Sequence, residues 1–320
     1  MTEANRVQNS PHQSTIPPRS AGNVWAERIF VNLTQIFAIA VAGVLVAIAI
    51  QVAIGAWPAI KEYGLSFMIE SAWDPVSQTY GALPMIYGTL VSSGIALLLA
   101  FPIGVGTAIF LQENFIPSSI RTPLTYMVEL LAAIPSVVYG LWGIYVLIPF
   151  LKPIGEWLHQ NLGFIPLFST PYIGPGMFPA ALILAVMILP ILTAIARDSL
   201  ASLPPHLRQG SLGLGATRWT TIFRVLIPSA FSGIVGGTIL ALGRAIGETM
   251  ALTMLIGNAN DLKFSLLAPA NTIASLLANQ FAEASGLQIS ALMYAALVLF
   301  VMTLVVNMLA EVIIRSVKPY

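Results

Sequence analysis

Long apolar runs separated by short polar segments set the pattern of the chain. Six of these runs are long enough to cross a bilayer, since about 20 residues at 1.5 Å each span roughly 30 Å of hydrocarbon. The connections contain turn formers, for example Trp57-Pro58 and Asp74-Pro75. The pattern predicts an all-α integral membrane protein of about six transmembrane helices, at residues 29–56, 83–111, 126–151, 177–196, 228–256 and 290–314.

The N-terminal segment differs from the rest of the chain. Residues 1–24 are polar and rich in Ser, Pro, Gln and Asn, so we expect a disordered tail that precedes a transmembrane domain at residues 25–320. The uncharged run from Ile29 to Ile60 is much longer than a signal-peptide core of roughly 7–15 residues. This run is therefore expected to remain as the first span.

The segment 257–289 between the last two spans carries a helical pattern of its own. Ile273, Leu276, Leu277 and Phe281 recur at the spacing of one helix face. This spacing favours a short amphipathic helix that lies on the outer surface. A plug over a pathway is the alternative.

Composition supports a membrane location. Of 320 residues, 57% are apolar and only 8% are charged, whereas soluble domains carry roughly a quarter charged residues. Most of the exterior must therefore face membrane lipid. The net charge of +1 gives no bulk attraction for nucleic acid, and the absence of cysteine excludes disulfides, a thiol nucleophile and cysteine-ligated metal sites.

Positive charges are distributed unevenly between the two sides. With both termini placed in the cytoplasm, the predicted spans leave ten Lys and Arg residues inside, three outside and one within a span. The inner set comprises Arg6, Arg19, Arg28, Arg121, Arg197, Arg208, Arg218, Arg224, Arg315 and Lys318, and the outer set comprises Lys61, Lys152 and Lys263. This bias predicts cytoplasmic N- and C-termini.

Catalytic motifs are absent from the sequence. There is no Gly-Lys pair, hence no phosphate-binding loop of a nucleotide hydrolase, and no zinc-protease or serine-hydrolase motif. His12, His159 and His206 are far apart. We therefore expect no enzyme, no catalytic residue, no metal and no cofactor, and any energy source for transport has to lie on another chain.

The segment 197–227 is the longest structured connection on the inner side. It is predicted to form two short helices with a turn at Gly215, where glycine permits a bend that other residues resist, and Pro228 begins the next span. An ordinary positively charged loop is one interpretation. Apolar residues on an otherwise exposed loop favour a docking surface instead, and here they are Leu212, Leu214, Trp219 and Phe223.

This segment resembles the EAA coupling loop of bacterial ABC importer permeases. That pattern is Glu-Ala-Ala, three residues, Gly, nine residues, then aliphatic, any residue, aliphatic and Pro, and the Gly, the two aliphatic residues and the Pro are matched by Gly215, Val225, Ile227 and Pro228. Gln replaces the Glu, so the carboxylate is lost while hydrogen bonding is kept. The resemblance implies that an ATPase docks on Gln209, Gly210, Ser211, Gly215, Arg218 and Trp219.

Three segments in order strengthen the resemblance: residues 134–143 (IPSVVYGLWG), 214–219 (LGATRW) and 243–251 (GRAIGETMA). Together they are similar to the phosphate importer permeases, and the last is closer to the PstC-type subunit than to its PstA-type partner. The similarity covers residues 25–318. It implies a MetI-like permease in the bacterial inner membrane that works with a PstA-like permease, two PstB-like ATPases, an external PstS-like phosphate-binding protein, and phosphate as substrate.

Two charged residues lie inside the predicted fifth span. Arg244 near a bilayer centre costs roughly 2.5–3.5 kcal/mol on insertion scales, so it must face protein or water. Glu248 follows at i+4, where the two can pair on one helix face, and a purely structural ion pair is the alternative to a functional one. A guanidinium fork matches two phosphate oxygens. The predicted substrate pathway comprises Gly243, Arg244, Gly247, Glu248 and Thr249, because glycines also permit close approach.

Two other acidic residues leave alternatives open. Glu129 near the start of the third span either lies at the membrane interface or points into the bundle. Asp198 is expected to cap a helix rather than to belong to the site. For the whole chain, the alternative function is a self-contained secondary transporter or channel for a small oxyanion, which has no need of an apolar docking loop.

Overall fold

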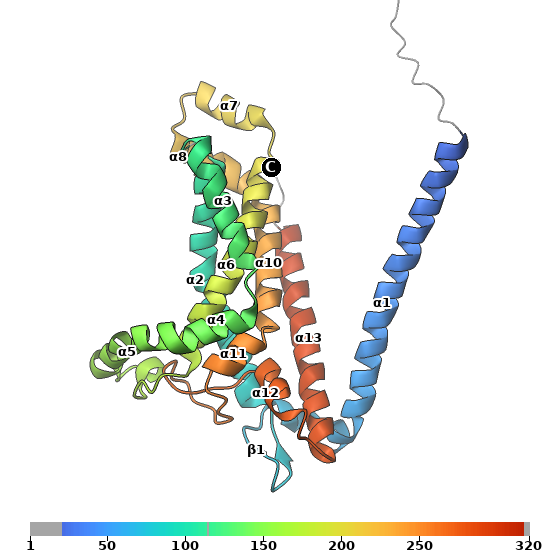
Figure 1. Cartoon of the computed structure of the whole chain (residues 1–320), viewed down its shortest axis with the longest axis vertical. Helices are drawn as coiled ribbons and strands as arrows, with labels where there is room; N and C mark the ends of the chain where they lie inside the picture. Colours follow the sequence, from blue (N-terminus) through green and yellow to red (C-terminus); the bar gives the residue numbers. More distant parts are fainter. Residues whose placement is uncertain (1–20, 114, 317–320) are drawn as a thin grey trace, which may run out of the picture. The chain divides into compact units, whose positions relative to one another are not determined.

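The computed structural model describes residues 21–113 and 115–316, and most of them are helical (Figure 1). The chain divides into two units, residues 1–51 and residues 52–320. In chain order the elements are α1 (Ala21–Tyr63), η1 (Gly64–Met68), β1 (Trp73–Asp74), β2 (Thr79–Tyr80), α2 (Leu83–Gln112), α3 (Ser118–Ala132), α4 (Ser136–Trp142), η2 (Gly143–Leu147), α5 (Ile148–Leu162), η3 (Pro166–Phe168), α6 (Met177–Ala201), α7 (Pro205–Gly213), α8 (Arg218–Thr221), η4 (Ile222–Leu226), α9 (Ile227–Ser229), α10 (Phe231–Ile246), α11 (Met250–Leu255), α12 (Ile273–Gln280) and α13 (Leu287–Ser316).

The first unit holds the N-terminal part of α1. From Ile36 to Ile50 its side chains are apolar on every face of the helix, and large ones such as Phe37 and Ile39 are exposed. A helix that is hydrophobic all round suits lipid rather than water. The helix begins at Ala21, within the stretch that the sequence predicts to be disordered, and the remainder of that tail, residues 1–20, lies outside the described residues.

The second unit is built around α2, α6 and α10, which run alongside one another (Figure 1). Among the candidate spans α6 is the most buried, with 61% of its most apolar window covered by other helices. Small residues let the helices approach closely, as where Gly104 of α2 faces Leu192 of α6. The Thr193 hydroxyl also donates a hydrogen bond to the Gly104 carbonyl at 3.3 Å.

The predicted number of spans is confirmed. Five helices among the described residues are long and apolar enough to cross a membrane, and a bent pair of helices makes up to six. The predicted spans at 29–56, 83–111, 177–196 and 290–314 lie within α1, α2, α6 and α13.

The prediction of one continuous span at residues 126–151 is wrong. Helix α3 ends at Ala132, and α4 begins at Ser136. Pro135 lacks an amide hydrogen and disfavours helical geometry at Ile134, so the helix breaks there. Figure 1 shows α3 following the direction of α6, while α4 and α5 turn sideways. The segment Ser136–Leu162 nevertheless meets the length and composition of a span.

The prediction of one continuous span at residues 228–256 is also wrong. The chain bends by 69° between the segment Arg218–Ser229 and the helix α10. Helix α10 then ends at Ile246, and the short α11 begins at Met250. The span is thus broken at the three residues Gly247, Glu248 and Thr249.

Helix α12 is not a surface helix, which corrects the favoured interpretation of residues 273–281. Its first turn is buried, and the side chains of Thr272 and Ser275 form a reciprocal capping box at its N-terminus. The amide of Ile273 donates to Thr89 Oγ1 of α2 at 3.1 Å. The close approach depends on Gly88, which lies directly against the backbone carbonyl of Asn271.

We predict that Gly88→Ala destabilises the second unit, because the added methyl group would overlap the Asn271 carbonyl, which belongs to backbone and cannot rotate away. Overpacking of this kind costs about 1–3 kcal/mol. The measurement is the midpoint of thermal unfolding of the purified protein in detergent.

Gly94→Ala is the matched control in the same helix, since nothing lies within 4 Å of its added carbon. Equal unfolding midpoints for the two variants would show that α12 does not depend on contact with α2.

Candidate functional site

The break between α10 and α11 gathers three of the predicted pathway residues. Gly247 directly follows α10, and its carbonyl accepts a hydrogen bond from the Thr249 hydroxyl at 3.2 Å. Glu248 is buried, with 8% of its surface exposed, and its Oε1 accepts a long hydrogen bond from the Ala251 amide at 3.4 Å. Thr249 and Glu248 therefore supply hydrogen-bond partners for backbone groups at the break.

Arg244 lies in the last turn of α10 on the exposed side of the helix. It is 13 residues beyond Phe231, the first residue of α10, and therefore about 20 Å along the helix axis. Its side chain lines an open groove of about 470 Å³. The other lining residues are Ile191 of α6, Gly236, Ile239, Leu240 and Gly243 of α10, and Asn307 of α13.

The predicted pairing of Arg244 with Glu248 does not occur. Among the described residues no ion pair joins them, and one side chain is exposed while the other is buried. The reason is the break, because α10 ends at Ile246 and Glu248 no longer continues the helix face that carries Arg244. The i, i+4 relation holds only where the helix is unbroken.

A second groove of about 470 Å³ adjoins the break. Gly247 and Thr249 line it together with Phe281 next to α12 and Ala296 of α13. Ala296 and Asn307 are eleven residues apart, close to three helical turns, so the two grooves lie along one face of α13. The predicted pathway residues are thus divided between two neighbouring hollows, apart from Glu248, which is buried at the break.

Asn307 is a residue that the sequence analysis missed. It is exposed in the groove that holds Arg244 and sits in an otherwise apolar part of α13. A polar amide in a membrane span is costly unless it faces protein or water. A single amide in the last apolar run was the available signal.

The 197–227 segment forms two short helices with the predicted turn between them. Gly215 has a φ of +84°, a left-handed conformation that glycine adopts without strain. Thr217 caps α8 by accepting a hydrogen bond from the Thr220 amide at 3.2 Å. Beside the turn, Leu214 is 92% exposed and forms the apolar tip of the segment.

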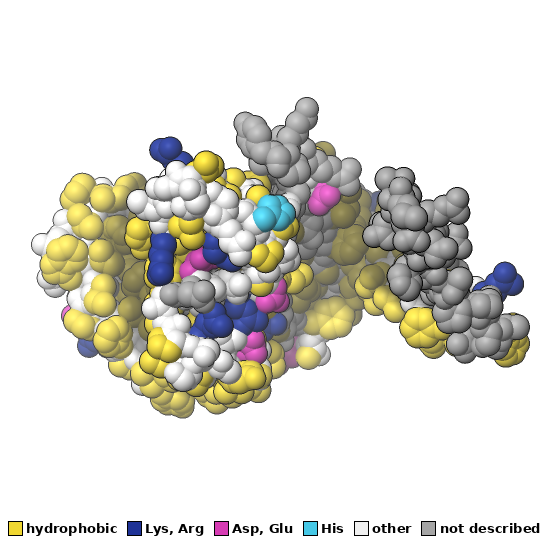
Figure 2. Space-filling model, turned by 90° about the horizontal axis from the view of Figure 1, so that it is seen from above, with side chains coloured by type: hydrophobic (Ala, Val, Ile, Leu, Met, Phe, Trp, Pro, Cys, Tyr) yellow, Lys and Arg dark blue, Asp and Glu magenta, His cyan; other side chains and the backbone are white. Residues whose placement is uncertain are grey.

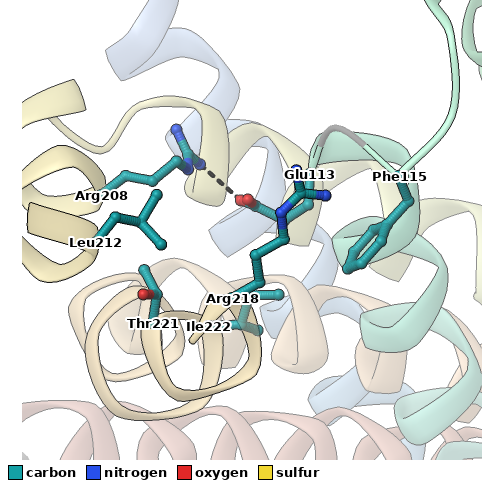
Figure 3. Close-up of a pocket in the computed structure, with 7 residues that line it drawn as sticks. All are labelled: Glu113, Phe115, Arg208, Leu212, Arg218, Thr221 and Ile222. Atoms are coloured by element: carbon teal, nitrogen blue, oxygen red, sulfur yellow. Dashed lines mark hydrogen bonds and ion pairs between the residues drawn. The ribbon is translucent and has the colours of Figure 1, made fainter. Parts of the chain in front are cut away.

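The predicted docking residues have different surroundings. Gln209 and Gly210 on α7 are exposed, while the Ser211 and Thr221 hydroxyls are 3.0 Å apart. Arg218 reaches into a small cavity of about 110 Å³ between α7, α8 and the end of α2 (Figure 3). The remaining two residues, Gly215 and Trp219, lie at the turn and in α8.

Trp219 has partners within its own chain. Its ring stacks on Phe223 with a centroid distance of 5.9 Å and lies 5.7 Å from the ring of Phe115. Phe115 in turn stacks on Phe110 of α2 at 6.3 Å. Part of the apolar surface that suggested docking is therefore used to hold the loop against α2, although 59% of Trp219 remains exposed.

Ion pairs gather at the end of the second unit that carries α7 and α8, here called the α7 end. Figure 2 looks onto this end and shows Lys and Arg side chains beside Asp and Glu. Arg197 bonds Glu129 of α3 at 3.1 Å and Asp198 at 3.1 Å. Glu129 thus pairs with α6 rather than lining either groove around Arg244, and Asp198 is a pairing residue near the end of α6 rather than a helix N-cap.

Comparison with known proteins identifies the family. Residues 100–319 match the family described as binding-protein-dependent transport system inner membrane component. This chain belongs to that family. The permease is therefore a multi-pass membrane protein of a binding-protein-dependent transport system, and a self-contained channel or secondary transporter is excluded.

Relatives of the permease carry a more specific name. The phosphate transport system permease protein PstC of Haemophilus influenzae is 46% identical over 299 residues, which are 92% of this chain and 95% of that protein. The PstC of Mesorhizobium japonicum is 43% identical over 91% of this chain and 90% of that protein. The probable PstC of Methanocaldococcus jannaschii is 38% identical over 79% and 82%.

Solved structures of ABC transporters share the fold of the permease. An inward-facing MetNI methionine ABC transporter matches with a TM-score of 0.57 at 16% identity, over 77% of this chain and 100% of that one. A bacterial ABC transporter involved in the import of alginate matches with a TM-score of 0.54 at 18% identity, over 91% and 99%. The predicted MetI-like permease architecture is confirmed.

We predict that Gly215→Val opens the turn of the permease loop while Gly215→Asn leaves it closed. A β-branched residue is strained at positive φ by roughly 1–2 kcal/mol, whereas asparagine adopts this conformation with little strain. Limited trypsin digestion reports the change, because Arg208 and Arg218 flank the turn and their cleavage should speed up only in the valine variant.

Gly213→Val serves as the control, since Gly213 is helical, has no positive φ and has no neighbour within 4 Å of an added carbon. Similar cleavage rates for the valine and asparagine variants at position 215 would argue against a left-handed turn there.

Proposed function

We propose that this chain is a transmembrane permease subunit of an ATP-driven phosphate importer and forms half of its translocation pathway. The proposal rests on Arg244, an exposed cation that has no ion-pair partner among the described residues and lines a groove that is open on one side. Relatives named as phosphate transport permeases that match more than nine-tenths of the chain support phosphate as the substrate.

The groove suits a phosphate ion chemically. The guanidinium of Arg244 offers a fork of donors that two phosphate oxygens can accept. Asn307 on α13 adds an amide donor within the same hollow. Gly236 and Gly243 have no side chains, so the wall of α10 leaves room for an ion. Among the residues that line the groove, Arg244 is the only charged one, and the two glycines lie on the same helix.

We propose that a second chain covers the open side of the groove. A guanidinium exposed to hydrocarbon is costly, so Arg244 has to face water or another protein. We assign this role to a second, PstA-like permease, which closes the groove into a pathway. An external PstS-like binding protein delivers phosphate to the complex.

Glu248 has a role other than the one that its spacing predicts. Its carboxylate accepts from the amide of Ala251 and so helps to hold the break between α10 and α11. We propose that it shapes the backbone around Gly247 and Thr249, which line the adjoining groove. The orientation of Arg244 does not depend on it.

The 197–227 loop is the proposed docking surface for one of two PstB-like ATPase subunits, which carry out ATP hydrolysis. Leu214 projects from the turn, and Arg218 and Arg224 beside it are exposed. No Asp or Glu occurs between residues 199 and 247. The partner surface should therefore offer an apolar hollow for Leu214 and acidic groups for the arginines, since opposite charges steer association and set register.

The proposed orientation places the α7 end and both termini in the cytoplasm of the bacterial inner membrane. The elements α3, α6, α7 and α8 bring Arg121, Arg197, Arg208 and Arg218 to that end, whereas Lys152 in α5 and Lys263 in the loop before α12 belong to the other. Positively charged connections favour the cytoplasmic side.

We expect a cysteine at position 202 to be shielded, and one at position 285 to be labelled, when an impermeant thiol reagent is added to intact cells. Both serines are exposed, one before α7 and the other before α13, and the chain has no cysteine of its own. Labelling of Ser202→Cys but not Ser285→Cys would reverse the orientation.

We predict that Arg244→Gln lowers phosphate uptake by the reconstituted importer at least about 100-fold, the effect of two lost charge-assisted hydrogen bonds. Arg244→Lys keeps the positive charge but loses the fork of donors, so its phosphate uptake should fall about tenfold or more. Asn307→Leu should lower phosphate uptake about fivefold, because it removes one neutral hydrogen bond. Phosphate-stimulated ATP hydrolysis and uptake into proteoliposomes measure these effects.

Lys152→Gln controls for the loss of one positive charge, because this residue is exposed and distant in sequence from the groove. The double variant Arg244→Gln with Glu248→Gln should stay inactive. Transport by that double variant would sink the pathway assignment, because it would mean that the two residues only neutralise each other.

A further inference from the structure

An ion pair joins the proposed ATPase-docking loop to the end of α2. Arg208 Nη2 of α7 lies 2.6 Å from Glu113 Oε1, and Glu113 is the residue that directly follows α2. The side chain of Glu113 is only 14% exposed and that of Arg208 is 33% exposed. At this distance and burial the contact is a strong, charge-assisted hydrogen bond that is partly shielded from solvent.

Few other contacts hold α7. None of its residues is fully buried, and of its apolar side chains Leu207 is half-buried while Leu212 is exposed. Besides the pair with Glu113, its Ser211 hydroxyl contacts Thr221 at the end of α8. Figure 3 shows Arg208 reaching across from α7 toward Glu113 above the cavity that Arg218 enters from the other side. The position of α7 therefore depends on these polar contacts.

The second half of the loop is held to the same region by aromatic rings. Phe115, two residues after Glu113, lies against Trp219 of α8, and Trp219 stacks on Phe223. Ile222 and Leu226 are buried in a cluster with Ala108 and Ile109 of α2. Both halves of the loop are thus anchored at the end of α2, the first by charge and the second by apolar packing.

Helix α2 leads from the loop toward the groove. It packs along α6 and also contacts α10, the helix that carries Arg244. A shift of α7 along its axis would pull on Glu113 and hence on the end of α2. Packed helices move as rigid bodies rather than deforming, so the displacement reaches the neighbouring helices.

We propose that the Glu113–Arg208 pair is the mechanical link that converts movement of the docked ATPase into movement of the permease helices. Both are positioning residues, and neither contacts the substrate. The inference rests on the proposed function, because it requires that the 197–227 loop docks an ATPase. It adds that α7 acts through α2.

The test uses the complete importer in proteoliposomes, with phosphate uptake and ATP hydrolysis measured together. Glu113→Gln and Arg208→Gln should assemble normally and still hydrolyse ATP, while phosphate carried per ATP falls about tenfold, the effect of one lost charge-assisted hydrogen bond. The exchanged pair Glu113→Arg with Arg208→Glu should regain most of the ratio. Glu129→Gln is the matched control, since its pair with Arg197 joins α3 to α6 at the same end without involving α7.

A normal ratio in both single variants would overturn the proposal. So would a loss of uptake and hydrolysis in proportion to a loss of assembled complex, which indicates a role in folding alone. A crosslink from Leu214→Cys to the ATPase tests docking on the loop independently of the Glu113–Arg208 pair. If it forms while the ratio is unchanged, the link is wrong but docking stands; if it does not form, docking itself is wrong and the link falls with it.

Discussion

A bilayer offers no water to backbone amides and carbonyls, and this constraint explains most of the unusual features of the permease. A span can be interrupted only where other groups replace the lost hydrogen bonds. After α3 ends, the Tyr139 hydroxyl donates to the Leu131 carbonyl at 2.8 Å. At the second interruption Thr249 bonds the Gly247 carbonyl, and Glu248 accepts from Ala251. At these two breaks, a polar side chain replaces part of the lost backbone hydrogen bonding.

Because the span is interrupted, Arg244 and the residues of the break line two different grooves. Helix α10 presents Arg244 to the groove beside α13, while the residues of the break line the neighbouring hollow next to α12. Helix α12 is joined to α2 by the hydrogen bond from the Ile273 amide to Thr89, and the other end of α2 meets the loop at Glu113. Helix α2 thus contacts α12 near its N-terminal end and the 197–227 loop at its C-terminal end.

Much of the architecture could be predicted from the sequence, and the family resemblance was correct. Runs of apolar residues located the spans that are single helices, such as α2 and α6, because length and composition decide those. The same criterion failed at residues 126–151 and 228–256, where apolar composition continues through a backbone break. Pro135 was a visible signal for the first. In the second, Pro228 lies just before the 69° bend, but the break at residues 247–249 has no proline, and Gly247 alone does not identify a helix end.

Only part of the site could be predicted from the sequence, because the same helix breaks change which residues lie together. Gly215 and its turn followed from the motif, and Arg244 from the cost of a membrane charge. The pairing of Arg244 with Glu248 was inferred from helical spacing that the break removes, and Asn307 comes from a helix more than 60 residues away in sequence. Contacts such as Glu113 with Arg208 join segments 95 residues apart, which periodicity cannot reveal.

The open groove also sets a charge balance. Among the residues that line it, Arg244 is the only formal charge, and it contributes +1. A phosphate group carries roughly one to two negative charges near neutral pH. One such cation balances a singly charged phosphate but only half of a doubly charged one, for which the proposed partner chain across the groove would supply the remainder. Neutrality of the loaded pathway would then be a property of the pair of permeases, so that neither subunit by itself offers the ion an uncharged route.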